Sequence, residues 1–396
     1  MSSQKDTIPK LHILLLDQGR QALPFLKSLK KSGHHITIVC TSKISEGYFS
    51  LYADRKLIWP NYTENLKGYE NALLTYLSVH KPDVTIPLGD ISASVIANNR
   101  EQILQFTKVT IPPLEIFNLA ADKGNTMMFC MENNIPCPKT FLPTEDSLGN
   151  ILSNISFPVI MKPRHGNGAV GVTRFNTADD LINQYKKMNA AYGELLIQEF
   201  IPQENGMQFC AEVFMDADAQ MKVCVVILKP RFFPIAGGTG TAYVTIERPD
   251  IEETVRQLLE GIKWTGPADV DFILDPRDQI PKVLEINPRV SACIKIAFAA
   301  GVDFANYTVD LALGLPIKKV VRYKQNVCLR NTVMESLWFI SATGKMRRNT
   351  YPAFFSLKNV VEETFSWSDP FTMLGYILGL IRKYSSIKKL RRKFHK

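Results

Sequence analysis

The first third of the chain alternates short apolar runs with stretches in which apolar residues recur at helical spacing. The apolar runs predict four strands, at residues 11–16, 35–40, 56–59 and 84–87. Between the third and fourth runs, residues 66–79 have the periodicity of a helix. Strands that alternate with helices predict a parallel sheet with right-handed crossovers. Leu88-Gly89-Asp90 follows the fourth strand, at the kind of strand end where such sheets bind ligands.

The middle of the chain has a different order of elements, with paired strands and glycine-rich loops. We expect one helix over residues 119–132, which contains Lys123, and an apolar strand over 157–162 that ends in Lys162. Further helices are expected at 177–188, 251–262 and 306–314, and further strands at 195–201, 210–215, 222–228, 270–274 and 282–286. The last two strands flank a short polar turn, which predicts an antiparallel hairpin.

Length and composition describe a folded protein of several domains. At 396 residues the chain is too long for one ordinary core, and two or three domains are expected. Hydrophobic residues make up 45% and charged residues 21%, which is typical of a soluble protein, and no apolar run approaches the roughly 20 residues of a membrane span. The seven cysteines are scattered and form no CxxC motif. Reduced thiols and a cytoplasmic location are therefore expected.

The net charge of +9 is concentrated at the end of the chain. No acidic residue follows Asp369, whereas eight lysines and arginines lie between residues 382 and 396. Without these eight charges the net charge is about +1, so the basicity belongs to the tail. Apolar residues recur at near-helical spacing here, and a basic amphipathic helix over residues 370–396 would lie on the anionic inner face of a membrane. A docked helix with a solvated end explains the pattern equally well. Nucleic acid binding is disfavoured, because the cluster lacks an aromatic stacking platform.

The densest candidate chemistry is in Val283-Leu284-Glu285-Ile286-Asn287-Pro288-Arg289. Alternate residues of a strand share a face, so Glu285, Asn287 and Arg289 can point the same way. A carboxylate and an amide oxygen suit Mg²⁺, and a guanidinium suits a phosphate or a carboxylate. An edge strand with polar residues facing water would show the same pattern. Asp271, across the predicted hairpin from Glu285, favours the metal interpretation, because facing carboxylates repel unless a cation lies between them.

Two further segments indicate a nucleotide. Lys162 lies at the end of an apolar strand, where burying an ammonium without an anion is costly, and the loop after it contains Gly166 and Gly168. Such a loop can offer backbone N–H groups to phosphates, although a plain hairpin turn is its commoner meaning. Gln198-Glu199-Phe200-Ile201 has the donors, acceptors and apolar side chains that a purine edge requires. An ordinary amphipathic strand explains that segment as well.

Together these motifs resemble the ATP-grasp superfamily of carboxylate–amine and carboxylate–thiol ligases, which includes biotin carboxylase and the halves of carbamoyl phosphate synthetase. The resemblance extends from about Lys123 to about Pro316. It implies a mixed α/β and α+β fold with three parts: an N-terminal parallel-sheet, Rossmann-like domain (1–118), a two-subdomain ATP-grasp fold (119–320, divided at about 196/197), and a helical C-terminal extension (321–396).

The resemblance also implies roles for individual residues. Lys123 and Lys162 match the two lysines that contact nucleotide phosphates, and Gly166 and Gly168 match the glycine-rich flap. The adenine-facing hinge and the acid on the ribose or adenine side correspond to Gln198, Glu199, Ile201 and Glu212. The metal ligands correspond to Asp271, Glu285 and Asn287, and the residues in contact with the transferred phosphoryl group to Arg289 and Lys162. Arg231, Gly237 and Gly238 are candidates for holding the carboxylate substrate.

The implied activity is that of an ATP- and Mg²⁺-dependent ligase, with Mn²⁺ as an alternative metal. The γ-phosphoryl group of ATP would move to a carboxylate, and an amine would attack the acyl phosphate. No protein nucleophile is needed, in agreement with a sequence that shows no Ser/His/Asp or Cys/His constellation. The expected partners are a small-molecule carboxylate and an amine, and a homo-oligomer is expected. A carbamoyl-phosphate or carboxylase-type enzyme and a non-catalytic ATP-binding regulator remain alternatives.

Overall fold

The N-terminal part of the computed structural model is a parallel sheet covered by helices on both faces. The structure describes residues 9–166, 168, 170–202, 207–235 and 237–384. The sheet has the order β3-β2-β1-β4. Its elements are β1 (His12–Leu16), α1 (Ala22–Lys31), β2 (His35–Cys40), α2 (Glu46–Phe49), β3 (Arg55–Ile58), α3 (Leu66–His80), β4 (Val84–Pro87), α4 (Asp90–Asn98), α5 (Arg100–Ile103) and α6 (Leu114–Ala121). The parallel sheet expected from the apolar runs is therefore confirmed.

The side chains of β1 point alternately to the two faces of the parallel sheet, which explains why helices cover both faces. Leu14 belongs to the core on the side of α3, and Leu15 to the core on the side of α1. Successive side chains of a strand point to opposite faces, so a run that is apolar at every position must be buried on both sides. At about 25 cal/mol per Å² of apolar surface removed from water, this burial stabilises the sheet from both sides.

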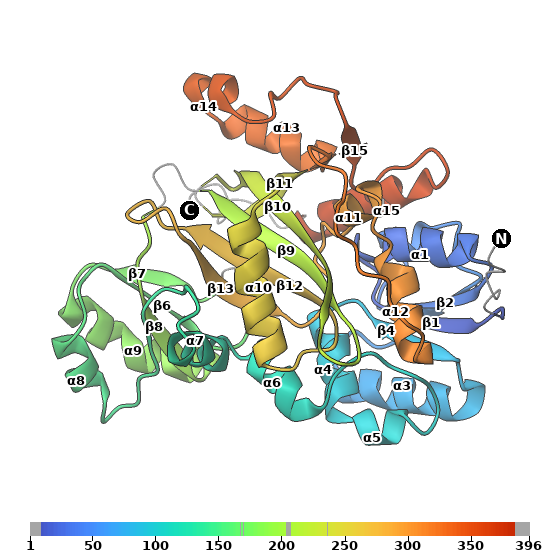
Figure 1. The fold of residues 1–396 in the computed structure, drawn as a ribbon, viewed down its shortest axis with the longest axis horizontal. Helices are drawn as coiled ribbons and strands as arrows, with labels where there is room; N and C mark the ends of the chain where they lie inside the picture. Colours follow the sequence, from blue (N-terminus) through green and yellow to red (C-terminus); the bar gives the residue numbers. More distant parts are fainter. Residues whose placement is uncertain (1–8, 167, 169, 203–206, 236, 385–396) are drawn as a thin grey trace.

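A small four-stranded sheet forms a lobe of its own at one end of the molecule (Figure 1). Its strand order is β5-β8-β6-β7. The elements of this lobe are α7 (Lys123–Glu132), β5 (Thr140–Phe141), α8 (Leu148–Ser153), β6 (Val159–Pro163), β7 (Thr173–Phe175), α9 (Ala178–Tyr192) and β8 (Leu195–Glu199). The lobe has a separate hydrophobic core between its sheet and α9, and the glycine-rich loop joins its antiparallel strands β6 and β7.

The third unit is a seven-stranded sheet of order β13-β12-β9-β10-β11-β14-β15. Its elements are β9 (Gln208–Met215), β10 (Met221–Phe233), β11 (Thr239–Thr245), α10 (Pro249–Gly261), β12 (Gly266–Leu274), β13 (Pro281–Asn287), α11 (Lys295–Ala299), α12 (Phe304–Leu313), β14 (Cys328–Arg330), α13 (Thr332–Ser341), α14 (Gly344–Asn349), β15 (Val360–Glu362) and α15 (Phe371–Tyr384). Helix α10 covers one face, while α11 and α12 lie on the other. Two continuous cores join this sheet to the N-terminal domain.

Several elements differ from their predicted extents. The helix expected over 119–132 is two helices, because the Asp122 side chain accepts hydrogen bonds from the backbone N–H groups of Gly124 and Asn125 and so starts α7 anew. Strand β8 crosses the expected subdomain boundary at 196/197. Strands β14 and β15 of the expected helical extension join the large sheet. The predicted hairpin of β12 and β13 is present.

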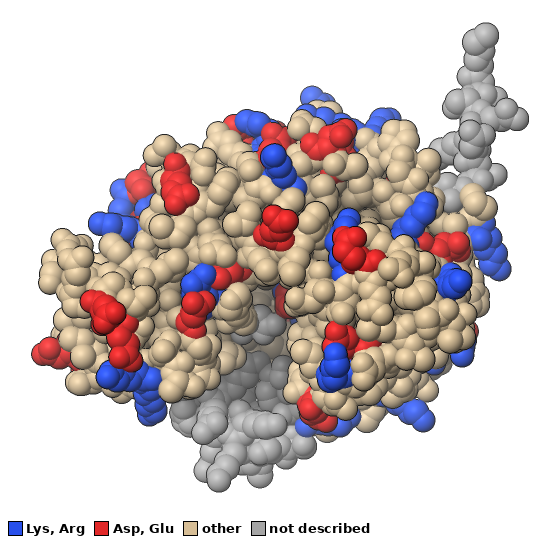
Figure 2. Space-filling view, turned by 90° about the horizontal axis from the view of Figure 1, so that it is seen from below, with Lys and Arg blue, Asp and Glu red and all other residues tan. Residues whose placement is uncertain are grey.

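On the face shown in Figure 2, the described residues form no large patch of a single charge sign. Lysines and arginines lie among aspartates and glutamates there, and the surface is hollowed between the small lobe and the N-terminal domain. None of the helices in the described part of the chain is long and apolar enough to cross a membrane. The basic tail beyond Tyr384 lies outside the described residues.

Candidate active site

Polar side chains form a cluster on one face of the large sheet, at its β12–β13 edge. Asp271 lies directly opposite Glu285 on the neighbouring strand, and Asp269 lies opposite Asn287. Residues two apart on a strand share a face, so these four side chains lie on the same side of the hairpin. The Asn287 amide donates a hydrogen bond to Asp269 Oδ2 at 3.1 Å. The structure thus brings together Asp271, Glu285 and Asn287, as the sequence predicted.

Two lysines offset the charge of the facing carboxylates. Lys229 on β10 donates a hydrogen bond to Asp271 Oδ1, and Lys123 Nζ lies 3.2 Å from Glu285 Oε2. Burial acts to lower the pKa of Lys229, but the Asp271 carboxylate outweighs it and holds that pKa well above its usual value. Without a metal, each of these two carboxylates therefore has an ammonium as its counterion.

Lys123 and Lys162 converge on Glu285 from the small lobe. Lys123 is the first residue of α7, and its ammonium also donates to the carbonyl oxygen of Gly166 in the glycine-rich loop at 2.6 Å. Lys162 on β6 is buried. Burial lowers the pKa of Lys162 to about 8, with Glu285 raising it and Lys123 lowering it further. A buried ammonium beside a second one is a position that a polyphosphate would stabilise.

The break between α6 and α7 places Lys123, the first residue of α7, next to the glycine-rich loop. Arg164, at the base of the glycine-rich loop, donates from Nε to Asp122 Oδ1 at 2.9 Å, and its carbonyl oxygen accepts from the Lys123 backbone N–H at 3.1 Å. These bonds tie the start of α7 to the loop. The Arg164 guanidinium and burial act in opposite directions on Asp122, and the net effect is a lowered pKa.

Arg289 connects the cluster to the N-terminal domain. Its Nε donates to Asp90 Oδ1 at 2.9 Å, and its guanidinium also donates to Asn287 Oδ1 at 3.2 Å. Asp90 is the first residue of α4, just beyond the end of β4. This strand end was expected to face a ligand, and it lies next to the polar cluster of the large sheet.

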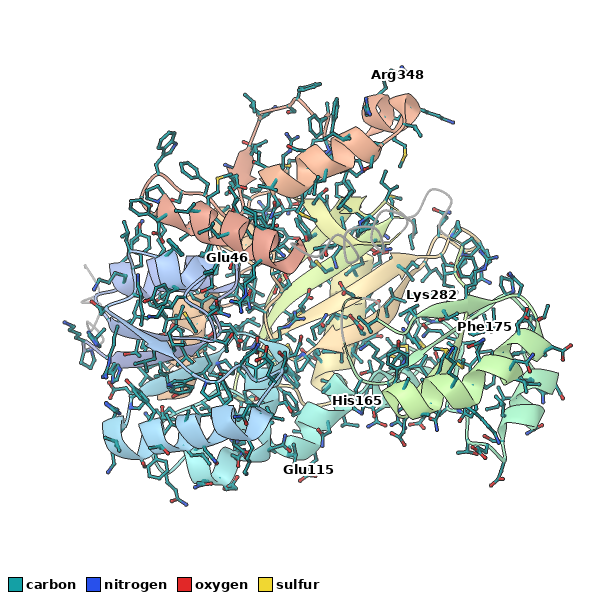
Figure 3. All side chains as sticks on the ribbon, turned by 180° about the vertical axis from the view of Figure 1, so that it is seen from behind. Glu46, Glu115, His165, Phe175, Lys282 and Arg348 are labelled. Atoms are coloured by element: carbon teal, nitrogen blue, oxygen red, sulfur yellow. The ribbon has the colours of Figure 1, made fainter. Side chains whose placement is uncertain are left out.

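The expected adenine-facing segment lies where the small lobe meets the large sheet. The Gln198 amide donates to Thr140 within the lobe, and the Ile201 side chain is buried. Glu199 Oε1 lies 3.7 Å from Nζ of Lys282 on β13, and Figure 3 shows Lys282 and His165 between the large sheet and the lobe. The segment therefore forms the joint between the two sheets.

Glu212 does not have the exposure that its expected contact with ribose or adenine requires. It is fully buried in β9, where its carboxyl group accepts a hydrogen bond from the Ser291 backbone N–H at 3.1 Å. Burial and the neighbouring Asp269 raise the pKa of Glu212 well above its usual value. Glu212 is opposite Asp269 on the neighbouring strand, so it lies beside Asp269 on the same face of the sheet, in the buried part of the polar cluster.

The candidates for substrate binding lie elsewhere. Arg231 is buried, and its Nε donates to both carboxylate oxygens of Glu335 on α13 at 3.0 Å. Its guanidinium is thus held by a partner inside the protein. Gly237 and Gly238 form the turn between β10 and β11, where a Cβ at Gly238 would lie 2.1 Å from the Phe233 backbone. That close approach is a structural reason for a glycine at this turn.

Two residues of the cluster, Asp269 and Lys229, were not predicted from the sequence. Asp269 precedes Asp271 by two positions, and period-2 alternation could have placed both on one face. Burial, followed by the charge of Asp271, raises the pKa of Asp269 to about 7. Lys229 was missed because the predicted strand ended at residue 228, whereas β10 continues to Phe233.

The donor set fits a hard divalent cation. Asp271, Glu285 and Asn287 provide carboxylate and amide oxygens from two adjacent strands, which is the ligand chemistry of Mg²⁺. Among the described residues, two groups have ligand atoms within 4.8 Å of one another: Cys210, Asp269 and Asp271, and also Asp122, His165 and Glu194. The first group shares Asp271 with the cluster, and its thiol is the least suitable ligand for such an ion.

The fold and this cluster define the class of protein. Residues 120–293 match the family model described as ATP-grasp domain, and this part of the chain is an ATP-grasp domain. The D-aspartate ligase of Enterococcus faecium (strain Aus0004) is 24% identical over 253 residues, which are 59% of this chain and 60% of that protein. The carbamoyl phosphate synthase large chain of Clostridium acetobutylicum is 22% identical over 316 residues, which are 75% of this chain and 28% of that protein.

Solved structures show the same fold. Biotin carboxylase from Campylobacter jejuni is similar with a TM-score of 0.67 and 17% identity, over 80% of this chain and 74% of that chain. N5-carboxyaminoimidazole synthetase from Staphylococcus aureus, complexed with ADP, is similar with a TM-score of 0.65 and 15% identity, over 81% and 82%. L-amino acid ligase from Bacillus licheniformis has a TM-score of 0.58 and 16% identity, over 78% and 75%. The ATP-grasp fold expected from the motifs is therefore confirmed.

Proposed function

We propose that the protein is an ATP- and Mg²⁺-dependent ligase that activates a carboxylate as an acyl phosphate and joins it to an amine. The observation that carries the proposal is the convergence of Lys123 and Lys162 on Glu285, which faces Asp271 across the hairpin. This arrangement supports binding of a metal-bound polyphosphate on the large sheet beneath the glycine-rich loop. The D-aspartate ligase, of which the match covers 60%, supports the same class of reaction.

Each residue of the cluster has a proposed task. Lys123 and Lys162 hold the phosphates of ATP, and Asp271, Glu285 and Asn287 hold Mg²⁺, with Mn²⁺ as an alternative. The bound metal neutralises charge that develops on the transferred phosphoryl group. Gln198, Glu199 and Ile201, at the joint between the sheets, line the adenine site. The Gly166 and Gly168 backbone N–H groups close over the phosphates.

Arg289 is proposed to hold the carboxylate and then the acyl phosphate. A guanidinium binds either anion with two parallel hydrogen bonds. Its contact with Asp90 at 2.9 Å supports a substrate position between the large sheet and the end of β4. Arg231, buried against Glu335, is not proposed as a substrate ligand, and fully buried Glu212 is not proposed as a ribose ligand.

The affinity for MgATP is expected to fall as the pH rises through about 8. The Lys162 ammonium has a pKa of about 8, so it is charged below this pH and neutral above it, and only the charged form attracts phosphates. Above pH 8 we expect the dissociation constant for MgATP to rise by up to about tenfold per pH unit. Calorimetric titration between pH 7 and 9.5 measures this dependence. In Lys162→Arg, which stays charged, the constant should change little; identical curves for both proteins would contradict the role of Lys162.

The ligase activity can be tested by screening for ADP release. We expect ADP production only when a carboxylic acid and an amine are both present. D-aspartate, L-amino acids and other small carboxylates form the acid panel, because relatives and similar structures include a D-aspartate ligase and an L-amino acid ligase. Mass spectrometry of the product should show an amide formed with loss of water. ADP release that needs neither an acid nor an amine would refute this reaction.

A carbamoyl-phosphate or carboxylase-type reaction is the second candidate. The carbamoyl phosphate synthase match spans 75% of this chain, and biotin carboxylase has a similar fold. In that case bicarbonate alone should stimulate ADP release, so a bicarbonate arm in the same screen separates the two reactions. A non-catalytic ATP-binding regulator would bind MgATP and release no ADP in any arm.

Location and assembly remain predictions. We propose a cytoplasmic protein that forms a homo-oligomer. Helix α15 is present over Phe371–Tyr384, and Phe371, Leu374 and Ile381 are exposed on it. This supports peripheral membrane contact through residues 370–396, whose six basic residues after Tyr384 lie outside the described residues. Co-sedimentation with vesicles of anionic and of neutral lipids tests the contact.

A further inference from the structure

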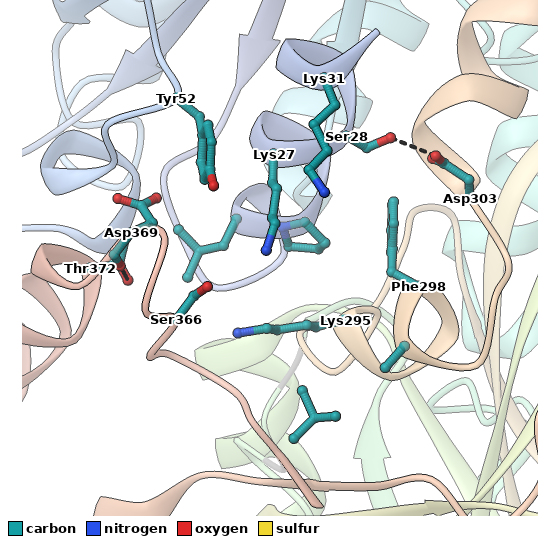
Figure 4. A pocket seen from close by; sticks show the side chains of 14 residues that line it. Lys27, Ser28, Lys31, Tyr52, Lys295, Phe298, Asp303, Ser366, Asp369 and Thr372 are labelled. Atoms are coloured by element: carbon teal, nitrogen blue, oxygen red, sulfur yellow. Dashed lines mark hydrogen bonds between the residues drawn. The ribbon is translucent and has the colours of Figure 1, made fainter. Parts of the chain in front are cut away.

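A cavity of about 350 Å³ lies among α1, α11 and the segment that joins β15 to α15 (Figure 4). Its walls come from the N-terminal domain, from the helix after the metal-facing strand, and from the C-terminal extension. None of the residues that line it belongs to the cluster of phosphate- and metal-facing side chains. In Figure 1, α1 and α15 lie at the other end of the molecule from the small lobe.

Three lysines line this cavity, and each has unused hydrogen-bonding capacity. Lys295, the first residue of α11, donates to the carbonyl oxygens of Glu363 and Phe365 at 3.2 and 3.1 Å. An ammonium has three N–H groups, so one remains. Within the described part of the chain, neither the Lys27 nor the Lys31 side chain of α1 forms an ion pair or a hydrogen bond. Figure 4 shows Lys27 extending from α1 towards Lys295.

The two acids of the cavity form no ion pair with these lysines, and their hydrogen bonds come from neutral groups. Asp369 accepts from the Leu51 backbone N–H at 2.9 Å and from a serine hydroxyl. Asp303 accepts from Ser28 Oγ at 2.6 Å and caps α12. Three lysines and two aspartates give the lining a formal net charge of +1. Burial lowers the pKa of Lys295 to about 8, in spite of Glu362 and Glu363, which act to raise it.

The rest of the lining is suited to an organic group. Phe298 and Leu23 supply apolar surface, and the Tyr52 hydroxyl reaches the same space. A volume of about 350 Å³ lies within the range of small-molecule sites, roughly 300–1,000 Å³. We propose that this cavity binds a small phosphate monoester, with the phosphate between Lys27, Lys31 and Lys295 and the organic group against Phe298. A dianion matches three ammonium groups better than a single carboxylate does.

The site can be tested with phenyl phosphate as the probe, by calorimetric titration of the full-length protein at pH 7 in excess MgADP. The MgADP keeps the probe away from the lysines of the ATP-grasp site. We expect phenyl phosphate to bind with a dissociation constant below about 10 mM, benzoate to bind about tenfold more weakly, and phenol not to bind. Absence of phenyl phosphate binding, or stronger binding of benzoate, would overturn the proposal.

Variants locate the bound probe. Lys27→Met/Lys31→Met changes two side chains on the outer side of α1 and is expected to raise the dissociation constant for phenyl phosphate by at least about tenfold. Lys30→Met on the same helix is the matched control, since Lys30 pairs with Asp54 and does not line the cavity. Unchanged binding by the double variant would place the probe elsewhere and refute the site. Lys295→Met, with its thermal stability checked, should weaken binding in the same way, and unchanged binding by this variant counts against the site.

Discussion

Glu285→Gln is expected to lower kcat for ADP release by about 10²- to 10³-fold, with the fold intact. Glu285 faces Asp271 across the hairpin and lies 3.2 Å from Lys123. The amide keeps the shape of the side chain but removes the charge of a proposed metal ligand, so the proposed stabilisation of the transferred phosphoryl group should be lost. Steady-state ADP release, with the acid and amine found by the screen, measures the effect. The loss of metal binding can also be tested without a substrate pair, by calorimetric titration of ADP with and without Mg²⁺. We expect Mg²⁺ to increase the affinity of the wild type for ADP, and this gain to be lost in the variant.

The matched control for this variant is Asp278→Asn. Asp278 is in the turn of the same β12–β13 hairpin, with a partly exposed side chain 3.4 Å from Lys282. Loss of a carboxylate there should leave kcat within about twofold of the wild type, since exposed ion pairs contribute little. Undiminished turnover by Glu285→Gln, or equal losses in both variants, would contradict the assignment of Glu285 as a metal ligand.

The elements best predicted from the sequence were those whose pattern is local. Strand β2 was predicted at its observed bounds, because an apolar run between polar residues has few alternatives. The β12–β13 hairpin was predicted from two apolar runs around a polar turn, and it placed Asp271 opposite Glu285. The resemblance assigned Lys123 and Lys162 to the phosphates of a nucleotide, but it did not predict that both lie near Glu285.

Other features depend on contacts between distant segments. The α6–α7 break is an exception, because it has a local signal, Asp122 followed by Gly124, which the helical periodicity across 119–132 concealed.

The remaining features do depend on distant segments. Lys229 lies inside a strand because Asp271 on another strand compensates its charge. The pairing of Arg289 with Asp90 joins residues 199 positions apart, which no local pattern encodes. The burial of Glu212 likewise depends on the loop after β13.

Arg231 shows why residue type alone was misleading at one position. An arginine close to a glycine loop was expected to hold the substrate, whereas the structure buries it against Glu335. Burying a charge is costly unless it has a counterion. An arginine near a glycine loop can therefore have a buried acid of the protein as its partner instead of a substrate. In this chain the pair joins β10 to α13 and so connects the large sheet with the C-terminal extension.

Arg231→Met is expected to lower the free energy of unfolding by about 3 kcal/mol, because it leaves the buried Glu335 carboxylate with only the more distant Arg330, 3.9 Å away, as a counterion. Thermal unfolding followed by the fluorescence of Trp338, whose ring lies 5.4 Å from the Arg231 guanidinium carbon, measures the change. Arg256→Met, which removes two ion pairs on the surface of α10, with Glu253 and Glu260, is the control and should cost about 1 kcal/mol.

A double variant separates a structural role of Arg231 from a substrate-binding role. In Arg231→Met/Glu335→Leu both charges are absent, so most of the lost stability should return. The KM for the carboxylate should then match the wild type, since neither side chain would touch the substrate. If Arg231→Met instead kept its thermal stability and raised that KM, and the double variant did not restore it, Arg231 would be a substrate ligand. Glu335 would then serve to orient its guanidinium.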